Sequence, residues 1–434
     1  MIDPIIFGSV LIGLLALLIF FRVPVAVALG VSSFVTIVMS VGFDQSSFIA
    51  AQRMVSGISS VTLLAIPFFV LAGSLMNNGG IAARLIDAAS VLVGRMPGSL
   101  AQTNVVANAL FGSVSGAAVA AAAAVGTVIG PKQKAQGYST PFAASVNVAS
   151  APSGMLIPPS NTLIVYSLVS GTSVATLFMA GYIPGIMWML GCIAVVWFYT
   201  RNRPELRSTV RPSAKVVTTT LLKAVPAVVM IVVVIGGILA GVFTPTESAA
   251  IAVVYALVLG FIYKSIRVRD LPAIILNATS TTVMIIFLVA VSSIMSWAMA
   301  VSGLPSLISE AMLSLTDSKV VIMIIITIIL LLIGMILDPT PAILIFIPVF
   351  LPIITALGVD PIHFGILITF NLCLGTITPP VGVTLFVGVK VAKAKFEQVA
   401  KALLPFFAVL IILLFVVVFV PQLSLALPSL FGLE

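Results

Sequence analysis

Two short motifs interrupt long apolar stretches of this chain with the same placement of a glycine and a proline pair. Residues 153–159 read Ser-Gly-Met-Leu-Ile-Pro-Pro, and residues 374–380, which lie 221 positions later, read Leu-Gly-Thr-Ile-Thr-Pro-Pro. Proline has no N–H and clashes with the carbonyl of the preceding turn, so each motif predicts a helix break with unpaired carbonyls. In hydrocarbon, such carbonyls must line a cavity or hold an ion. The predicted chemistry is cation binding by backbone oxygens.

Each break has a polar partner segment earlier in the same half of the chain. Residues 112–116 read Gly-Ser-Val-Ser-Gly, and residues 334–340 read Gly-Met-Ile-Leu-Asp-Pro-Thr, each inside an apolar tract. Half-helix ends at such breaks offer free N–H groups to an anion and free carbonyls to a cation. Paired interruptions at equivalent places in two halves are typical of the binding site of a secondary transporter.

These segments predict one sodium site in each half, with a substrate between them. The candidate sodium ligands of the first half are Gly112, Ser113, Ser115, Gly154, Ile157 and Pro159. Those of the second half are Gly334, Asp338, Gly375, Thr378 and Val381. The candidate substrate contacts are Ser153, Ser160, Asn161, Thr340 and Thr376. Na⁺ is the only metal expected, as a coupling ion, and no catalytic residue or organic cofactor is expected.

Several of these residues also have a purely structural alternative. Gly112, Gly116 and Gly334 could serve only close helix packing, which small residues commonly allow in membranes. The Pro158-Pro159 pair could be an ordinary kink. Asp338 could act only as the N-cap of a helix that begins at the next residue, a proline.

Two titratable residues outside these segments also have two readings. Glu247 lies in Thr-Pro-Thr-Glu-Ser, where an acid in the first turn of a helix is a better explanation than an ion ligand. His363, the single histidine, follows Asp360-Pro361 near an expected helix start and could relay protons or simply pack. Cys192 and Cys373 stand alone in apolar stretches and are expected to pack as small hydrophobic residues.

The composition makes the lipid bilayer the main solvent of this chain. Hydrophobic residues make up 61% of the 434 residues and charged residues 7%, against about 25% charged in an ordinary soluble domain. Apolar tracts long enough to cross about 30 Å of hydrocarbon recur along the sequence. The expected fold is an all-α polytopic membrane protein: an inverted-repeat transporter with two re-entrant helical hairpins and two broken helices.

The net charge of +8 does not point to nucleic acid, because the basic residues form short clusters between apolar tracts, as topology signals do. The clusters are Arg201, Arg203, Arg207, Arg211, Lys215 and Lys223, then Lys264, Arg267 and Arg269, then Lys390, Lys393, Lys395 and Lys401. Placing them in the cytoplasm gives one path on which all of the 20 Lys and Arg residues except Arg53 and Lys319 lie on that side. Both termini then face outward.

The first half contains an odd number of crossings on this path, so the second half must be inverted. The first repeat is expected over 1–200, with scaffold helices in 1–93, a hairpin and broken helix in 100–170 and a return helix at 174–199. A basic cytoplasmic linker at 201–224 follows. The second repeat is expected over 225–434, with scaffold helices in 225–316, a hairpin and broken helix in 320–389 and a final helix at 403–420.

Nearly the whole chain resembles the large membrane subunit of tripartite ATP-independent periplasmic (TRAP) transporters. The resemblance rests on four segments: Ile66-Pro-Phe-Phe-Val-Leu-Ala-Gly73, Gly112-Ser-Val-Ser-Gly116, Leu156-Ile-Pro-Pro-Ser160 and Thr244-Pro-Thr-Glu-Ser-Ala-Ala250. It implies sodium-coupled, elevator-type import of an organic acid across the bacterial inner membrane. It also implies two partners besides lipid: a small four-helix membrane subunit and a soluble periplasmic substrate-binding protein. Many relatives carry an acid where this chain has Ala121, so no charge-based role is expected there.

Other functions fit the sequence less well. A channel would need a symmetric filter, whereas the breaks come singly in two inverted halves. A stand-alone sodium/dicarboxylate carrier of similar design is the nearest rival. The polar run Ser160-Asn161-Thr162 favours a hydroxylated sugar acid such as sialic acid over a plain C4-dicarboxylate.

Overall fold

The computed structural model describes residues 3–206, 213–316 and 318–433, and every regular element in these ranges is a helix. The first half contains α1 (Pro4–Phe20), α2 (Val25–Val41), α3 (Phe43–Ile58), η1 (Val61–Leu64), α4 (Ala65–Asn78), α5 (Ile81–Leu92), α6 (Ser99–Ser115), α7 (Ala118–Ala135), α8 (Thr140–Ser150), α9 (Ser153–Leu156), α10 (Asn161–Ser170) and α11 (Val174–Thr200). The second half contains η2 (Pro204–Leu206), α12 (Ala214–Leu239), α13 (Pro245–Ile262), η3 (Val268–Asp270), α14 (Leu271–Ser302), α15 (Leu304–Leu315), α16 (Lys319–Gly334), α17 (Pro339–Ala356), α18 (Pro361–Gly375), α19 (Val383–Ala392), α20 (Phe396–Phe419) and α21 (Gln422–Leu430).

Seven helical segments of the described chain are long and apolar enough to cross a membrane. They are Val61–Asn78, Val174–Thr200, Ala214–Leu239, Pro245–Ile262, Val268–Ser302, Pro339–Ala356 and Phe396–Phe419. The predicted all-α polytopic membrane fold is confirmed. Both predicted hairpins, α6–α7 and α16–α17, are present, and both predicted broken helices are interrupted at their proline pairs. Each pair is joined by a cis peptide bond.

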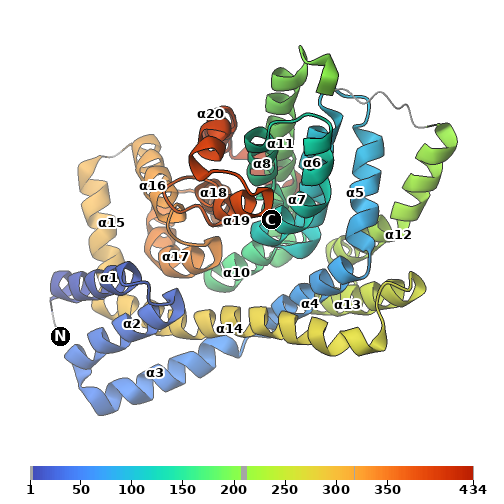
Figure 1. The fold of residues 1–434 in the computed structure, drawn as a ribbon. Coiled ribbons are helices and arrows are strands. Elements are labelled where there is room, and N and C mark those ends of the chain that lie inside the picture. The colour runs from blue at the N-terminus through green and yellow to red at the C-terminus, as the bar shows by residue number, and fades with distance from the viewer. Residues whose placement is uncertain (1–2, 207–212, 317, 434) are drawn as a thin grey trace.

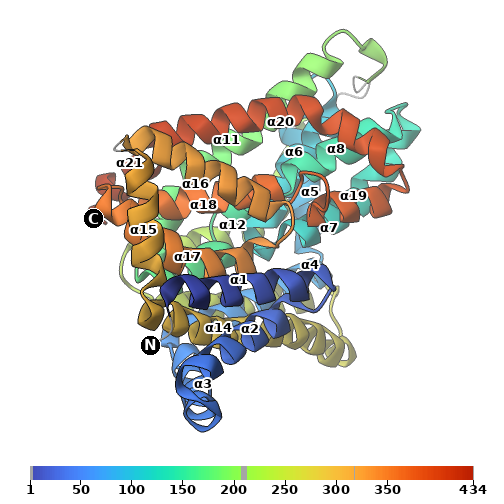
Figure 2. The ribbon, with the colours of Figure 1, turned by 90° about the vertical axis from the view of Figure 1, so that its left-hand side faces the viewer.

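The helices form an outer layer and an inner group (Figure 1). In the outer layer α2, α3 and α4 pack against the long helix α14, and α13 packs against α4. The inner group holds the two hairpins and the two broken helices, with α11 and α20 packed against each other (Figure 2). Helix α5 packs against α6 and α15 against α17, so each joins the outer layer to one hairpin.

The two halves place their inner helices in the same order and at the same spacing. Helix α7 begins at Ala118 and α17 at Pro339, and α8 begins at Thr140 and α18 at Pro361, each pair 221 positions apart. The outer helices differ, because α14 is one helix of 32 residues where the first half has the separate helices α3 and α4. Pro67 near the start of α4 prevents a continuous helix there, and the matching part of α14 has no proline.

Two stretches differ from the sequence expectation. Helix α12 begins at Ala214, inside the expected linker 201–224, because the Ser213 hydroxyl accepts a hydrogen bond from the Val216 N–H at 3.4 Å and starts the helix. Residues 207–212 of that linker lie outside the described residues. The helix at 403–420 is also expected to be the last one. The structure shows a further helix, α21, which follows α20 and packs against α11.

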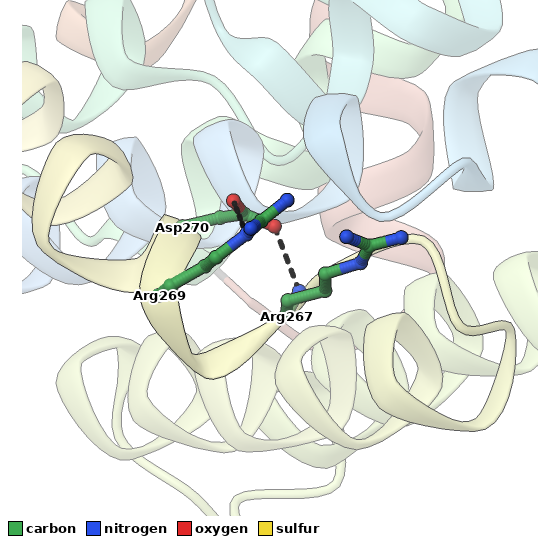
Figure 3. Close-up of polar contacts among 3 residues, drawn as sticks. All are labelled: Arg267, Arg269 and Asp270. Carbon is green, nitrogen blue, oxygen red and sulfur yellow. Dashed lines mark hydrogen bonds and ion pairs between the residues drawn. The ribbon is translucent and has the colours of Figure 1, made fainter.

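The second basic cluster is held in a turn before α14 (Figure 3). The Asp270 carboxylate accepts a hydrogen bond from the Arg267 N–H at 2.9 Å and lies 3.8 Å from Nε of Arg269. The Arg267 guanidinium extends away from Asp270. This is the one ion pair formed among the described residues, so most basic side chains remain as topology signals rather than as partners of acids.

The charge pattern can be tested with single cysteines in a chain whose Cys192 and Cys373 are replaced by alanine. Ser265 is exposed in the second basic cluster, and Gln45 is exposed at the start of α3. Ser46, the next residue of α3, is buried and would therefore be a poor reporter. We expect a membrane-impermeant maleimide to label Gln45→Cys in intact cells and Ser265→Cys only after the membrane is opened. Labelling of Ser265→Cys in intact cells would contradict the predicted orientation.

Candidate functional site

Each hairpin touches the broken helix of its own half through a pair of glycines. A Cβ atom placed on Gly154 would lie 2.2 Å from the backbone carbon of Gly112. In the second half, a Cβ atom on Gly375 would lie 2.4 Å from the backbone carbon of Gly334. The structure therefore brings one predicted ligand of each hairpin tip against one predicted ligand of the break in the same half. It also shows that these glycines do serve close packing, which is what places the hairpin tips against the breaks.

The second break shows how the freed backbone groups are arranged. The Gly382 N–H donates to the carbonyl of Met335 at 3.2 Å, which ties the break to the hairpin tip. Gly382 has φ +55°, and a Cβ atom there would lie 2.9 Å from the Thr378 carbonyl oxygen and 3.2 Å from that of Thr376. Only glycine suits this position. The two carbonyls thus lie close together where the backbone leaves the helix, but the Thr376 carbonyl already accepts from the Thr384 and Leu385 N–H groups at 3.0 and 3.4 Å.

Several predicted hydroxyl groups already donate their proton to their own helix. Ser113 donates to the Leu110 carbonyl at 2.9 Å and Ser153 to the Ser150 carbonyl at 2.6 Å. Thr376 and Thr378 do the same toward Cys373 and Leu374, both at 2.7 Å. A hydroxyl oxygen in such a bond keeps its acceptor lone pairs. These oxygens can therefore coordinate a cation, whereas they have no proton left for a carboxylate.

Two predicted substrate contacts lie at the start of α10. Ser160 is the N-cap of this helix, where its hydroxyl accepts from the Leu163 N–H at 3.3 Å and donates to the Met155 carbonyl. Asn161 is partly exposed and supports the tip of the first hairpin, because a Cβ atom on Gly116 would lie 2.7 Å from its Nδ2. Ser115, also partly exposed at that tip, makes only long hydrogen bonds, to the carbonyls of Ala117 at 3.4 Å and Gly112 at 3.5 Å.

Asp338 is the one acidic residue at a hairpin tip, and its side chain does not cap the helix behind it. It holds the N-cap position of α17, yet its carboxylate only approaches the Thr340 N–H and makes no capping hydrogen bond of ordinary geometry. Two other Asp-Pro pairs behave differently. Asp3 accepts from the Ile5 N–H at 2.8 Å, and Asp360 accepts from the Ile362 N–H at 2.7 Å. The exposed carboxylate of Asp338 is therefore available to a ligand.

The remaining predicted residues differ in how far they are exposed. Ile157 and Thr340 are partly buried, Pro159 is buried, and Val381 is 37% exposed. For Ile157, Pro159 and Val381 only the backbone carbonyl could act as a ligand, as the sequence predicts. The assignment of these residues to sodium or to substrate stays a prediction.

Two residues outside the tips have structural roles. Glu247 forms a capping box with Thr244: its carboxylate accepts from the Thr244 N–H at 2.8 Å, and its own N–H donates to the Thr244 hydroxyl at 3.2 Å. His363 is buried in α18, with Nδ1 3.3 Å from the Ser424 hydroxyl and Nε2 3.4 Å from the Val418 carbonyl. It thereby ties α18 to the C-terminal helices.

The sequence analysis missed a cavity of about 380 Å³ beside the first hairpin. Its walls come from α6, α7, α8 and α19, and its floor holds the buried side chains of Asn104, Gln133 and Asn147. A second cavity, of about 560 Å³, lies between the outer layer and the inner group, where Arg53 and several serines of α3 and α14 face α10 and α17. Asparagine and glutamine side chains recur within the otherwise apolar first hairpin, and this pattern could have predicted the first cavity.

The glycine contacts generate a test. Gly154→Ala and Gly375→Ala each force a methyl group into the backbone of a hairpin tip, and overpacking of this kind costs about 1–3 kcal/mol. We expect both variants to lower the Tm in detergent and to lose most transport per molecule in the membrane. Gly236→Ala on α12 is the control, because a Cβ atom there meets nothing within 4 Å and the residue is exposed. Normal transport by both tip variants would show that the tips need not touch the breaks.

Comparison with known proteins identifies the family. Residues 12–423 match the family model described as the tripartite ATP-independent periplasmic transporter, DctM component. The chain is 48% identical to the uncharacterized protein YgiK of Salmonella typhimurium, over 98% of this chain and 97% of that protein. It is 36% identical to the C4-dicarboxylate TRAP transporter large permease protein DctM of Rhodobacter capsulatus, over 98% and 99%. It is 35% identical to the sialic acid TRAP transporter large permease protein SiaM of Vibrio cholerae, over 88% and 90%.

The fold itself also has a solved counterpart. The crystal structure of the Alcanivorax borkumensis YdaH transporter, which has an unusual topology, superposes with a TM-score of 0.58. The match covers 90% of this chain and 88% of that one at 14% identity, so it shows a shared fold and nothing more. Together with the family model and the curated relatives, the paired hairpins and broken helices establish that this chain belongs to the DctM family, the large permease component of TRAP transporters.

Proposed function

We propose that this permease couples the inward movement of an organic acid to Na⁺ at the two hairpin tips. The observation that supports the proposal most directly is Asp338, a carboxylate at the tip of an apolar helical hairpin that makes no capping hydrogen bond of ordinary geometry to its own helix. A charge in this setting is costly unless it meets a counter-ion. A sodium ion among Asp338 and the carbonyls around Gly375 and Thr378 would supply that counter-ion.

The acid would be held by helix N-termini rather than by basic side chains. Four half-helices begin at the breaks: α7, α10, α17 and α19. Helix α7 has no capping hydrogen bond from a side chain, so its first N–H groups remain for a ligand. Helix α17 begins with Pro339-Thr340-Pro341 and can offer only the Thr340 N–H, which lies beside the Asp338 carboxylate. In α19 the Thr384 and Leu385 N–H groups donate to the Thr376 carbonyl at 3.0 and 3.4 Å. The positive end of a helix dipole favours an anion. Asn161 at the start of α10 would add an amide donor.

The proposed cargo is a small carboxylic acid. Relatives include permeases named for C4-dicarboxylates and for sialic acid, so the family handles acids of different size and polarity. Within this range, the sequence Ser160-Asn161-Thr162 favours a hydroxylated sugar acid. Because the Ser160 hydroxyl is used at the N-cap of α10, the contribution of this run would come mainly from Asn161.

We infer an elevator movement from the division of the helices. The uninterrupted helix α14, with α2, α3, α4 and α13 around it, would form the static layer. The inner group carries all the candidate ligands and would move as one body along this layer. Helices α5 and α15 connect the two parts on either side and would act as arms. The cavity between α14 and α17 would lie on the sliding interface.

Family membership implies two partners, a small membrane subunit and a periplasmic binding protein. We propose that the small subunit packs on the outer layer, where the surface is strongly apolar. Four side chains of α2 at successive turns are exposed: Val27, Val31, Val35 and Met39. The binding protein would deliver the acid to the side opposite the basic clusters, which is the periplasmic side on the predicted path.

Sodium dependence follows from the proposed ligands. Uptake into liposomes that contain the complete transporter should require an inward Na⁺ gradient and should carry net charge, with more than one Na⁺ per acid. A radiolabelled-acid uptake assay with valinomycin-controlled membrane potential measures both quantities. Undiminished uptake with K⁺ in place of Na⁺ on both sides would contradict the proposal, as would coupling to protons alone.

Asp338→Asn tests the second site. Asparagine keeps the volume and the N-cap preference but removes the charge, so we expect uptake to fall at least about tenfold, the effect of roughly 1.4 kcal/mol, and to need more Na⁺. Asp360→Asn is the matched control, because Asp360 also precedes a proline but does cap its helix. It should keep near-normal uptake. Equal Na⁺ dependence in the two variants would mean that Asp338 does not serve the ion.

A further inference from the structure

The cavity beside the first hairpin is built from both halves of the chain. It has a volume of about 380 Å³ and lies among α6, α7 and α8 of the first half and α19 of the second. Glycines close its walls: a Cβ atom on Gly126 would lie 2.6 Å from Nδ2 of Asn147, and one on Gly388 would lie 2.1 Å from Val148. The cavity is separate from the hairpin tips, whose glycines and Asp338 do not line it.

Its floor holds polar groups that have no partner within the described residues. Asn104 is fully buried and lines the cavity, and its Nδ2 amide makes no hydrogen bond. The Oε1 of Gln133, also fully buried, has no partner either. Asn147, in contrast, accepts from Asn108 at 3.0 Å and donates to the Ala122 carbonyl at 2.7 Å. Buried polar groups are normally paired, so the free donor on Asn104 and the free acceptor on Gln133 are suited to a polar ligand.

The mouth of the cavity is positively charged. Lys134 near the end of α7 and Lys393 after α19 both line it, and neither ammonium group has an ion pair or a hydrogen bond to another described residue. No aspartate or glutamate lines the cavity. Helix α8 begins at the wall with Thr140, and its N-cap residue Ser139 makes no capping bond, so free N–H groups are added there. All of these groups favour an anion.

We propose that this cavity is a second binding site for the carboxylate of an organic acid, on the side of the basic clusters. The carboxylate would accept a hydrogen bond from Asn104 and be attracted by Lys134 and Lys393, while a hydroxyl of the acid donates to Gln133. The volume suits a small acid, since ligand pockets begin at about 300 Å³. The inference rests on the proposed function in one respect, that the acid is the transported one, which would occupy this site on its way from the tips.

Cysteine protection tests the site without knowledge of the natural substrate. In a full-length chain whose Cys192 and Cys373 are replaced by alanine, Thr127→Cys places a thiol in the cavity wall. We expect 10 mM succinate or N-acetylneuraminate to slow its reaction with N-ethylmaleimide at least about threefold in the purified protein. Val128→Cys, the next residue, is exposed and does not line the cavity, so its reaction should not change.

Two sets of variants decide whether the proposed groups hold the acid. Asn104→Asp keeps the acceptor that Asn108 uses at 2.8 Å, but it loses the N–H donor and adds a negative charge, so protection should vanish. Lys134→Gln combined with Lys393→Gln should raise the half-protecting concentration several-fold. Lys132→Gln, which changes the same helix outside the cavity, should leave it unchanged. Full protection in Asn104→Asp and in the double variant would overturn the proposal.

Three further outcomes are informative. Protection by neither acid would overturn the proposal, and equal protection by 10 mM phosphate would also overturn it, because the site would then hold any anion. Protection that persists in Asp338→Asn and with K⁺ in place of Na⁺ would support a site independent of the tips. This last comparison separates the two proposals, because failure of sodium coupling leaves protection at Thr127→Cys intact, and failure of the cavity site leaves sodium-driven uptake intact.

Discussion

The structure depends on one constraint, that every backbone N–H and C=O inside hydrocarbon must find a partner. A helix meets it without help, and the chain departs from helix inside its apolar tracts only where two segments can satisfy each other. The bond from the Gly382 N–H to the Met335 carbonyl is a direct example, because it joins a broken helix to a hairpin tip. The Gly112–Gly154 and Gly334–Gly375 contacts serve the same end by bringing backbone against backbone. The groups left over are the ones that a transported ion and acid can use.

The three Asp-Pro pairs show how local chemistry and tertiary position diverge. Asp3, Asp338 and Asp360 share the same preference for an N-cap before a proline, and two of them form the expected bond. Asp338, at a hairpin tip, keeps only an approach to the Thr340 N–H that falls short of a capping hydrogen bond of ordinary geometry. A residue that departs from a local rule in this way is expected at a functional site.

The sequence was sufficient to predict the helical class, both hairpins and both broken helices, because prolines and glycines mark each interruption directly. It was not sufficient to predict the polar interior of the first hairpin. Asn104 lies in α6 and Asn147 in α8, with the whole of α7 between them in the chain. Only the packing of the helices shows that they line one cavity with Lys393 from the other half. The sequence also could not show that the hydroxyl groups of Ser153 and Thr376 donate their protons to backbone carbonyls of the preceding turn. The second half has no proline at the position that corresponds to Pro67, so the uninterrupted helix α14 could have been predicted.

The two halves share a backbone plan but divide the polar chemistry between them. Ser150 and Asn371 occupy positions 221 residues apart, and each ties its broken helix to the first helix of its hairpin: Asn108 donates to Ser150 at 2.9 Å, and Asn371 donates to the Thr327 carbonyl at 2.8 Å. Around these shared anchors, α6 carries Gln102, Asn104 and Asn108, whereas α16 is almost wholly aliphatic and is followed by Asp338. Duplication therefore preserved the places where backbone is freed, and later divergence placed neutral amides beside one hairpin and a single charge on the other. Such a division suits a carrier that must hold a cation and an anion near each other without joining them in a permanent ion pair.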